Sequence, residues 1–172
     1  MIDSPDLSGF AALARMAERV GERLRERGET IAVAESSAGG LISASLLAVS
    51  GASAYFQGGA VVYTGNAKGE LLHLDEDART KPRPATDGHA LKLARAVKDR
   101  LGTTWGLGET GATGPSGNRY GDPPGHAWIG LVGPEERTRL VRTGDFDRHN
   151  NMIAFAAGAI WLLADALGLE DD

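Results

Sequence analysis

Three short blocks of this sequence combine reactive side chains with glycines. The first spans residues 34–40 and reads A-E-S-S-A-G-G, with Ser36 near its centre. It follows an apolar run and precedes a helical pattern, so we expect backbone N–H groups and a helix dipole to point at a ligand. A serine placed there could attack a carbonyl carbon, and the N–H groups could hold an oxyanion or a phosphate. The alternative is that Ser36 or Ser37 only caps the following helix.

The second block, residues 63–68, reads Y-T-G-N-A-K and offers a base for that serine. Lys68 lies in the first turn of a predicted helix, where the helix dipole disfavours a positive charge. A serine without a matched histidine and aspartate can use a lysine as base. Such a lysine must be neutral near pH 7, so burial or charge repulsion must lower its pKa from about 10.4. Tyr63 could relay a proton or pack on a ring. The alternative is a surface lysine and a core tyrosine.

The third block, residues 110–117, reads T-G-A-T-G-P-S-G and also follows a predicted strand. It lies at the same sheet edge as Ser36 if the two strands are parallel. Its glycines suit binding of a phosphate or a ribose through backbone N–H groups. The glycine spacing matches neither a Walker A loop nor a dinucleotide-binding fingerprint. A flexible surface loop is the alternative.

Composition narrows the classes of function. The 172 residues carry a net charge of −5, without a basic run of the kind that duplex nucleic acid or an anionic membrane surface would need. The chain has no cysteine, which excludes disulfides, thiolate metal sites and a cysteine nucleophile. None of the four histidines has metal-ligand spacing, so we expect no metal. His126 with Asp122 is a weaker candidate for a metal or an acid–base role.

The ends of the chain and its hydropathy predict a cytoplasmic location. The first ten residues hold two aspartates and no apolar run, so no secretory signal is expected. No stretch of about 18 apolar residues is present, so no membrane span is expected.

Hydrophobic periodicity predicts alternating helices and strands. We expect helices over residues 10–24, 38–48, 66–74, 88–101 and 147–167, and strands over residues 30–34, 59–63, 105–108, 127–132 and 138–142. A glycine-rich loop is expected over residues 111–125, and the last two strands should form a hairpin. Residues 1–172 therefore predict a single three-layer α/β/α domain with a mixed sheet. The apolar last helix, with Phe155 and Trp161, is compatible with burial against a second subunit or against the core.

Taken together, the blocks resemble the CinA carboxy-terminal domain family, the nicotinamide-nucleotide amidohydrolases of the PncC type. Members of that family carry blocks like A-E-S-C-T-G-G, Y-S-N-E-A-K, T-G-I-A-G-P-x-G and K-P-V-G-T-V-W in this order. The corresponding blocks here are residues 34–40, 63–68, 110–117 and 122–128, and order and spacing match over residues 10–165. Four blocks in order are far more specific than any one of them.

The resemblance implies hydrolysis of the carboxamide of nicotinamide mononucleotide to nicotinate mononucleotide and ammonia, without a metal or an organic cofactor. It implies that Ser36 is the nucleophile, that Lys68 is its base and that Tyr63 assists proton transfer. The expected partner is a pyridine nucleotide-like small molecule. The residues expected to bind it are Ser37, Gly39, Gly40, Thr110, Gly111, Gly114 and Arg148.

The chain departs from the family pattern near the expected phosphate site. Ser37 and Ala38 replace a cysteine and a threonine, Asp122 replaces a lysine and His126 replaces a threonine. Arg148 matches a family arginine only with a two-residue insertion. These departures leave two alternatives open: a related hydrolase for a non-phosphorylated amide, or a non-catalytic nucleotide-binding module.

Overall fold

The centre of the molecule is a five-stranded sheet in the order β2-β1-β3-β4-β5. The computed structural model describes residues 8–169. Its strands are β1 (Ile31–Glu35), β2 (Phe56–Val61), β3 (Trp105–Ala112), β4 (His126–Val132) and β5 (Glu136–Arg142). Strand β1 pairs in parallel with β2 and β3, whereas β4 pairs antiparallel with β3 and β5. The mixed sheet and the closing hairpin are confirmed.

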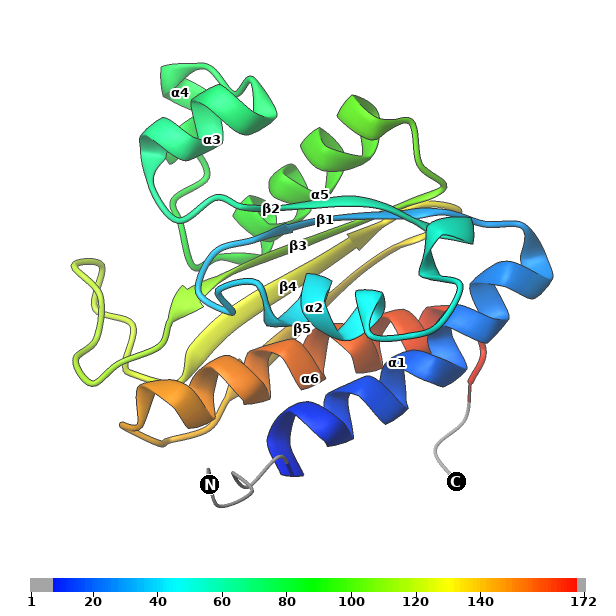
Figure 1. The fold of residues 1–172 in the computed structure, drawn as a ribbon. Helices are drawn as coiled ribbons and strands as arrows, with labels where there is room; N and C mark the ends of the chain where they lie inside the picture. The colour runs from blue at the N-terminus through cyan, green and yellow to red at the C-terminus, as the bar shows by residue number, and fades with distance from the viewer. Residues whose placement is uncertain (1–7, 170–172) are drawn as a thin grey trace, which may run out of the picture.

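Helices cover both faces of this sheet. They are α1 (Ser8–Arg27), α2 (Leu41–Leu47), α3 (Gly65–Leu72), α4 (Glu76–Thr80), α5 (Asp87–Leu101) and α6 (Arg148–Ala166), with a 3₁₀ turn η1 (Ala52–Ala54). Helices α1, α2 and α6 lie on one face and α5 on the other (Figure 1). Each face has its own apolar cluster, with Ile129 and Phe155 in the larger one and Leu93 and Val97 in the smaller one. The predicted three-layer α/β/α architecture is confirmed.

Side-chain caps explain where three of the helices begin. Thr64 accepts a hydrogen bond from the N–H of Ala67, Thr86 from that of His89, and Asp147 from that of Asn150. Each cap satisfies a backbone donor that has no partner within the helix. The expected starts of α3, α5 and α6 were therefore close to the observed ones.

Strand β3 is longer than expected, so Thr110 and Gly111 lie within it and not in a loop. The glycines before them have a packing role. A Cβ atom at Gly106 or Gly108 would overlap the backbone of α5. Close approach of the helix therefore requires glycine at these positions, and tertiary packing overrides the weak strand propensity of the segment.

Other boundaries also moved. Strand β2 ends at Val61, which leaves Tyr63 beyond the strand, and α2 begins only at Leu41 because Gly39 and Gly40 have positive φ angles of 68° and 102°. Helix α4 had not been expected. Within residues 8–169, no helix is both long and apolar enough to cross a membrane. The expectation of no secretory signal falls mostly on residues 1–7, which lie outside the described part.

Candidate functional site

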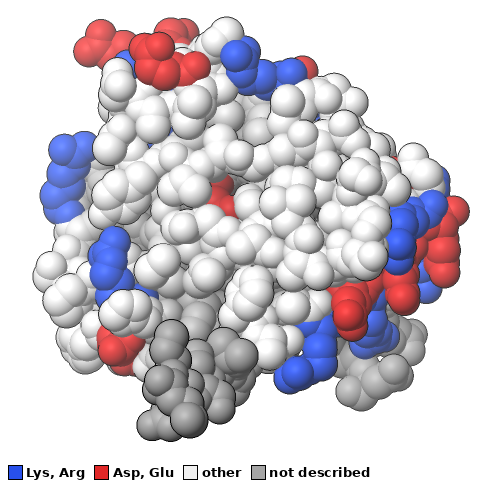
Figure 2. Space-filling model, viewed as in Figure 1, with Lys and Arg blue, Asp and Glu red and all other residues white. Residues whose placement is uncertain are grey.

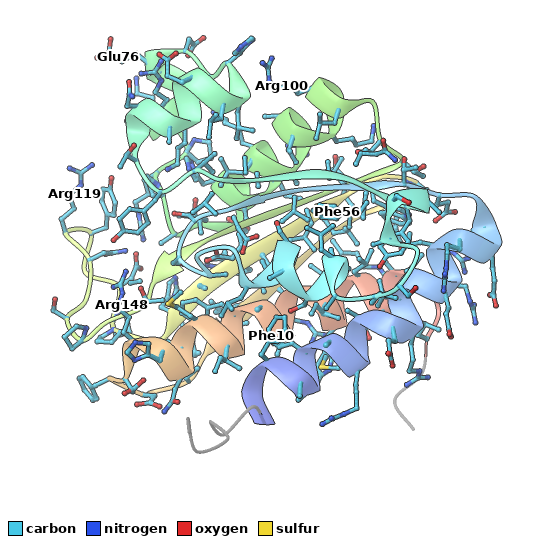
Figure 3. All side chains as sticks on the ribbon, viewed as in Figure 1. Phe10, Phe56, Glu76, Arg100, Arg119 and Arg148 are labelled. Atoms are coloured by element: carbon cyan, nitrogen blue, oxygen red, sulfur yellow. The ribbon has the colours of Figure 1, made fainter. Side chains whose placement is uncertain are left out.

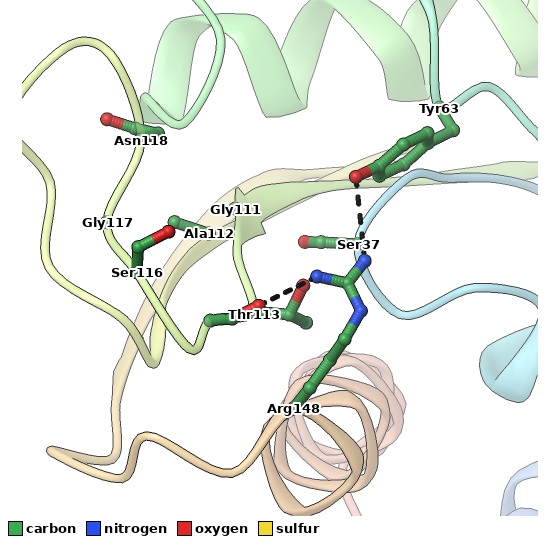
Figure 4. A pocket seen from close by; sticks show the side chains of 10 residues that line it. Ser37, Tyr63, Gly111, Ala112, Thr113, Ser116, Gly117, Asn118 and Arg148 are labelled. Carbon is green, nitrogen blue, oxygen red and sulfur yellow. Dashed lines mark hydrogen bonds between the residues drawn. The ribbon is translucent and has the colours of Figure 1, made fainter.

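The parallel pairing of β1 and β3 brings the first and third sequence blocks to one edge of the sheet. Two adjoining cavities open there. The larger, of about 390 Å³, is lined by Ser36, Tyr63, Gly65, Lys68, Arg79, Thr80, Pro84, Thr110, Gly111, Asn118, Arg119 and Tyr120. The smaller, of about 240 Å³, is lined by Ser37, Tyr63, Gly111, Ala112, Thr113, Gly114, Ser116, Gly117, Asn118 and Arg148 (Figure 4). Because Tyr63, Gly111 and Asn118 line both, the two cavities form one site.

The structure therefore brings together eight of the ten expected site residues. Ser36, Lys68 and Thr110 line the larger cavity, while Tyr63 and Gly111 line both. The smaller cavity adds the remaining three, which are Ser37, Gly114 and Arg148. The other two expected residues, Gly39 and Gly40, line neither cavity. Their positive φ angles serve the turn into α2, and the N–H of Gly40 is bound internally.

Lys68 is the fourth residue of α3 and is almost fully buried, with 5% of its surface exposed. Burial lowers the pKa of its amine, and the negative charge of Glu109 partly opposes that shift. No hydrogen bond joins Lys68 to Ser36 among the described residues, although both line the larger cavity. The sequence-based alternative of a surface lysine is wrong, and so is that of a core tyrosine, because Tyr63 is 60% exposed.

Glu109, in the middle of β3, is the main site residue that the sequence pattern did not single out. Its buried carboxylate accepts hydrogen bonds from the N–H groups of Ser36 (2.9 Å) and Ala38 (2.8 Å) and from the hydroxyl of Ser37. Burial raises the pKa of this carboxyl, while these three donors lower it. The N–H groups of Ser36 and Ala38 are therefore occupied, and the expectation that they receive an oxyanion or phosphate is corrected.

A second buried carboxylate, Glu35, caps helix α2. Its oxygens accept from the N–H groups of Gly40 (2.9 Å), Ile42 (3.1 Å) and Ser43 (3.0 Å), and from the Ser43 hydroxyl (2.6 Å). The expectation that Ser36 or Ser37 caps this helix is therefore wrong, since α2 has Gly40 at its N-cap and no capping bond from that residue's side chain. Glu35 and Glu109 thus bind the backbone of the turn between β1 and α2. The Ser36 hydroxyl has no hydrogen-bond partner among the described residues.

The site is lined by cations and by no carboxylate. Arg148 donates to the carbonyl oxygen of Gly114 (2.9 Å) and to the hydroxyl of Tyr63 (3.5 Å), as Figure 4 shows. Arg79 donates to a backbone carbonyl, and Arg119 lies against the ring of Tyr120. Within residues 8–169 none of these three arginines has a carboxylate within 4.0 Å. Arg119 and Arg148 come from different elements and lie at the same end of the molecule (Figure 3).

Asp122, which replaces a family lysine, lies outside both cavities. It pairs with both terminal nitrogens of Arg83, at 2.7 and 3.2 Å, and the Arg83 guanidinium lowers the pKa of its carboxyl. His126 is buried, with Nε2 3.2 Å from the carbonyl oxygen of Ala85 and 3.8 Å from Asp122. No group of three or more His, Cys, Asp or Glu side chains suited to a metal ion occurs in the described part of the chain. The Asp122 charge is thus neutralised locally and does not face the site.

His89 is a further buried group beside the site. It lies on α5, and its Nδ1 is 2.8 Å from the carbonyl oxygen of Pro82. A carbonyl partner requires Nδ1 to carry the proton. The pKa of His89 is lowered to about 4, first by burial and then by the positive charge of Lys68. The imidazole is therefore neutral at pH 7.

Comparison with known proteins identifies the family of this chain. The model of the CinA C-terminal domain family matches residues 13–167. A CinA-like protein of Nostoc sp. is 44% identical over 69% of this chain and 28% of its own length. A CinA-like protein of Salinibacter ruber is 38% identical over 82% of this chain and 34% of its own length. The chain thus spans about a third of the length of these curated relatives.

Solved structures show the same fold. The competence/damage inducible protein CihA from Agrobacterium tumefaciens superposes with a TM-score of 0.82 at 26% identity, covering 91% of this chain and 95% of that one. A CinA superfamily protein from Escherichia coli superposes with a TM-score of 0.84 at 19% identity, covering 96% and 94%. The second likeness concerns the fold alone.

Proposed function

This chain belongs to the CinA C-terminal domain family, and we propose that it is a cytoplasmic amidohydrolase that converts nicotinamide mononucleotide and water to nicotinate mononucleotide and ammonia. The observation that carries the proposal is the shared cavity of Ser36, Lys68 and Tyr63. These three side chains come from a turn, a helix and a connecting segment, and they line one cavity although Ser36 and Lys68 are 32 positions apart. The reaction is proposed to need no cofactor.

Ser36 is the nucleophile in this mechanism, and Lys68 is its base. A neutral Lys68 amine takes the Ser36 proton as the Ser36 oxygen forms a bond to the carboxamide carbon. The C–N bond then breaks, and Lys68 returns that proton to the departing ammonia. Water attacks the resulting ester, with Lys68 again taking a proton and passing it back to Ser36. The burial that lowers the pKa of Lys68 supports this role.

Thr110 is our candidate donor to the oxyanion, because the N–H groups of Ser36 and Ala38 are bound to Glu109. The Thr110 oxygen accepts a hydrogen bond from the N–H of Ala85 at 3.1 Å. Its own proton therefore remains available for an acceptor in the cavity. A donor aimed at developing charge lowers the barrier more than one that contacts only the ground state.

The charge of the lining supports a phosphorylated substrate over a neutral amide. Arg79, Arg119 and Arg148 line the two cavities, and Asp122 is paired outside them. A guanidinium group binds phosphate oxygens through parallel N–H donors. The smaller cavity, with Arg148, suits the phosphate when the carboxamide lies near Ser36 in the larger one.

Ammonia release from nicotinamide mononucleotide by the purified protein tests the proposal. We expect turnover by the native protein and a loss of at least about 100-fold in Ser36→Ala and in Lys68→Ala. Ser50→Ala and Lys98→Ala are the matched controls, since both residues lie outside the cavities, and they should keep native rates. Full activity in Ser36→Ala would refute the mechanism.

The substrate class is tested by nicotinamide riboside, which has the same carboxamide but no phosphate. We expect its kcat/KM to be far below that of the mononucleotide, and Arg148→Ala to remove most of the difference. Equal rates for both would favour a hydrolase of non-phosphorylated amides. Binding of the mononucleotide without any ammonia release would identify a non-catalytic nucleotide-binding module.

A further inference from the structure

One continuous segment of the chain carries no charge at all. Residues 36–67 contain no Asp, Glu, Lys, Arg or His, whereas charged residues make up 24% of the whole chain. The segment forms α2, η1 and the edge strand β2. An uncharged segment of this length would be unremarkable in a buried core, but this one reaches the surface.

Several side chains of the segment are exposed. Leu47 on α2 is 55% exposed and Val61 at the end of β2 is 45% exposed. Gln57 and Gly59 of β2 are exposed as well. Figure 2 shows a broad uncharged area across the face that carries α2 and β2, interrupted by one small acidic spot, with the charged groups gathered around its border. We call the part formed by residues 41–61 the uncharged face.

The two edges of the sheet differ in charge. Strand β5 carries Glu136, Arg137, Arg139 and Arg142 among its seven residues, whereas β2 carries no charged residue among six. Charged side chains on an edge strand prevent pairing with another chain, and an edge that lacks them is free to pair. Strand β2 pairs only with β1, so its other edge is unpaired within the described residues. The β5 edge is protected by charges, whereas β2 carries none and departs from regular pairing with β1 only at Gln57, where the register shifts.

We propose that the uncharged face is an interface with a second copy of this chain, in which the two β2 strands pair antiparallel across a two-fold axis. A two-fold interface places each residue near its own equivalent, so any charge close to the axis would meet a like charge. An uncharged surface avoids that repulsion. It also lacks the charges by which a partner of opposite charge would be selected.

A competing surface lies at the other side of the sheet. A groove of about 410 Å³ between β5 and α6 is lined by residues that include Arg139, Val141 and Trp161. Trp161 is 48% exposed, but the Arg139 guanidinium lies 5.9 Å from its ring centroid and also pairs with Asp165 at 2.5 Å. Because of these charges, the groove is less suited than the uncharged face to pairing with its own copy. The sequence had pointed to this side of the molecule, since Trp161 lies on the apolar last helix.

Sedimentation equilibrium of the full chain decides between the two surfaces. We expect the native protein to be a dimer at about 10 μM, and Leu47→Lys and Gln57→Lys each to weaken association by at least about tenfold. Both positions are exposed, and circular dichroism should show an unchanged fold. Trp161→Lys is the matched control on the β5–α6 groove and should remain dimeric.

Hydrogen exchange gives a second readout. Amide groups of β2 should exchange more slowly in the native protein than in Gln57→Lys at the same concentration, while those of β5 should be equal in both. A native protein that is monomeric at about 100 μM overturns the proposal. So does dissociation by Trp161→Lys while Leu47→Lys and Gln57→Lys stay dimeric. Neither result bears on the amidohydrolase activity, which is assayed separately.

Discussion

At the scale of single residues, the nucleophile turn depends on a carboxylate from a distant strand. Glu109 lies 73 positions from Ser36 and binds three donors of its turn. The negative charge of Glu109 also raises the pKa of the Lys68 amine. One side chain thereby positions the candidate nucleophile and influences the candidate base.

Replacing Glu109 by glutamine should shift the pH dependence of the reaction. Turnover needs a neutral Lys68, so kcat/KM rises as the pH increases through the Lys68 pKa. Removing the negative charge lowers that pKa further, so the rising limb should move to lower pH. The measurement is a pH–rate profile of Glu109→Gln beside Glu136→Gln, an exposed carboxylate control. An unshifted limb in an active, folded Glu109→Gln enzyme would mean that Glu109 does not influence Lys68.

His89 should make stability depend on pH in the acid range. Its pKa is about 4 when folded and 6.5 when exposed, so between these values the unfolded chain binds a proton that the folded chain does not. Stability therefore falls as the pH decreases from 6.5 to about 4, by about 3 kcal/mol in total from this group. His89→Asn keeps a donor for the Pro82 carbonyl but cannot titrate. Urea unfolding from pH 7 to pH 4 should show a smaller loss in His89→Asn than in the native protein.

His149→Asn provides the control for that series, because His149 is an exposed histidine. Its stability should follow the native curve at each pH. If His89→Asn also follows the native curve, burial of the imidazole does not contribute to the acid sensitivity.

At the scale of elements, the distance between α5 and the sheet is set by glycines. Gly106 and Gly108 of β3 and Gly130 of β4 lie directly under the backbone of α5. A side chain at any of them would push the helix away from the strands. Because Thr110 and Gly111 continue β3 into the site, this packing also determines where the site residues of β3 lie.

Gly108→Ala should therefore destabilise the protein. The added Cβ would overlap the carbonyl oxygen of Ala90, which is helix backbone and cannot move alone. We expect a loss of about 3 kcal/mol in the free energy of unfolding. Gly65→Ala is the matched control, since no atom lies within 4 Å of its added Cβ, and it should change stability by less than about 1 kcal/mol. Equal stability of the two variants, measured by urea unfolding, would show that α5 can shift without cost.

At the scale of the whole molecule, the charge of the site is opposite to the net charge of the chain. The chain carries −5, yet the two cavities are lined by three arginines and the Lys68 amine, and by no carboxylate. Local charge and not net charge governs the attraction of an anionic ligand into a cavity. Acidic composition therefore does not argue against a phosphorylated substrate.

Salt should weaken the binding of such a substrate. Between about 50 mM and about 500 mM sodium chloride, we expect the KM for nicotinamide mononucleotide to rise several-fold with little change in kcat, because mobile ions screen Arg79, Arg119 and Arg148. Steady-state kinetics with nicotinamide riboside provides the comparison without a phosphate. Its only charge is the positive pyridinium ring, so its KM should not rise with salt. A salt-independent KM for the mononucleotide would contradict an electrostatic role of these cations.

Features that depend on neighbouring residues were predictable from the amino-acid sequence. The order of the strands, the closing hairpin and every helix except α4 follow from hydrophobic periodicity. The resemblance to the family predicted ten site residues, and eight of them line the two cavities.

Features that depend on residues far apart in the chain became apparent only in the folded molecule. The pairing of Asp122 with Arg83 joins positions 39 apart, and the bonds of Glu109 to the Ser36 turn join positions more than 70 apart. The long β3 strand and the uncharged face likewise depend on which elements pack together. A local pattern cannot reveal these contacts, because the hydrogen-bond partner of a buried carboxylate is selected by the packing of the whole sheet and not by its sequence neighbours.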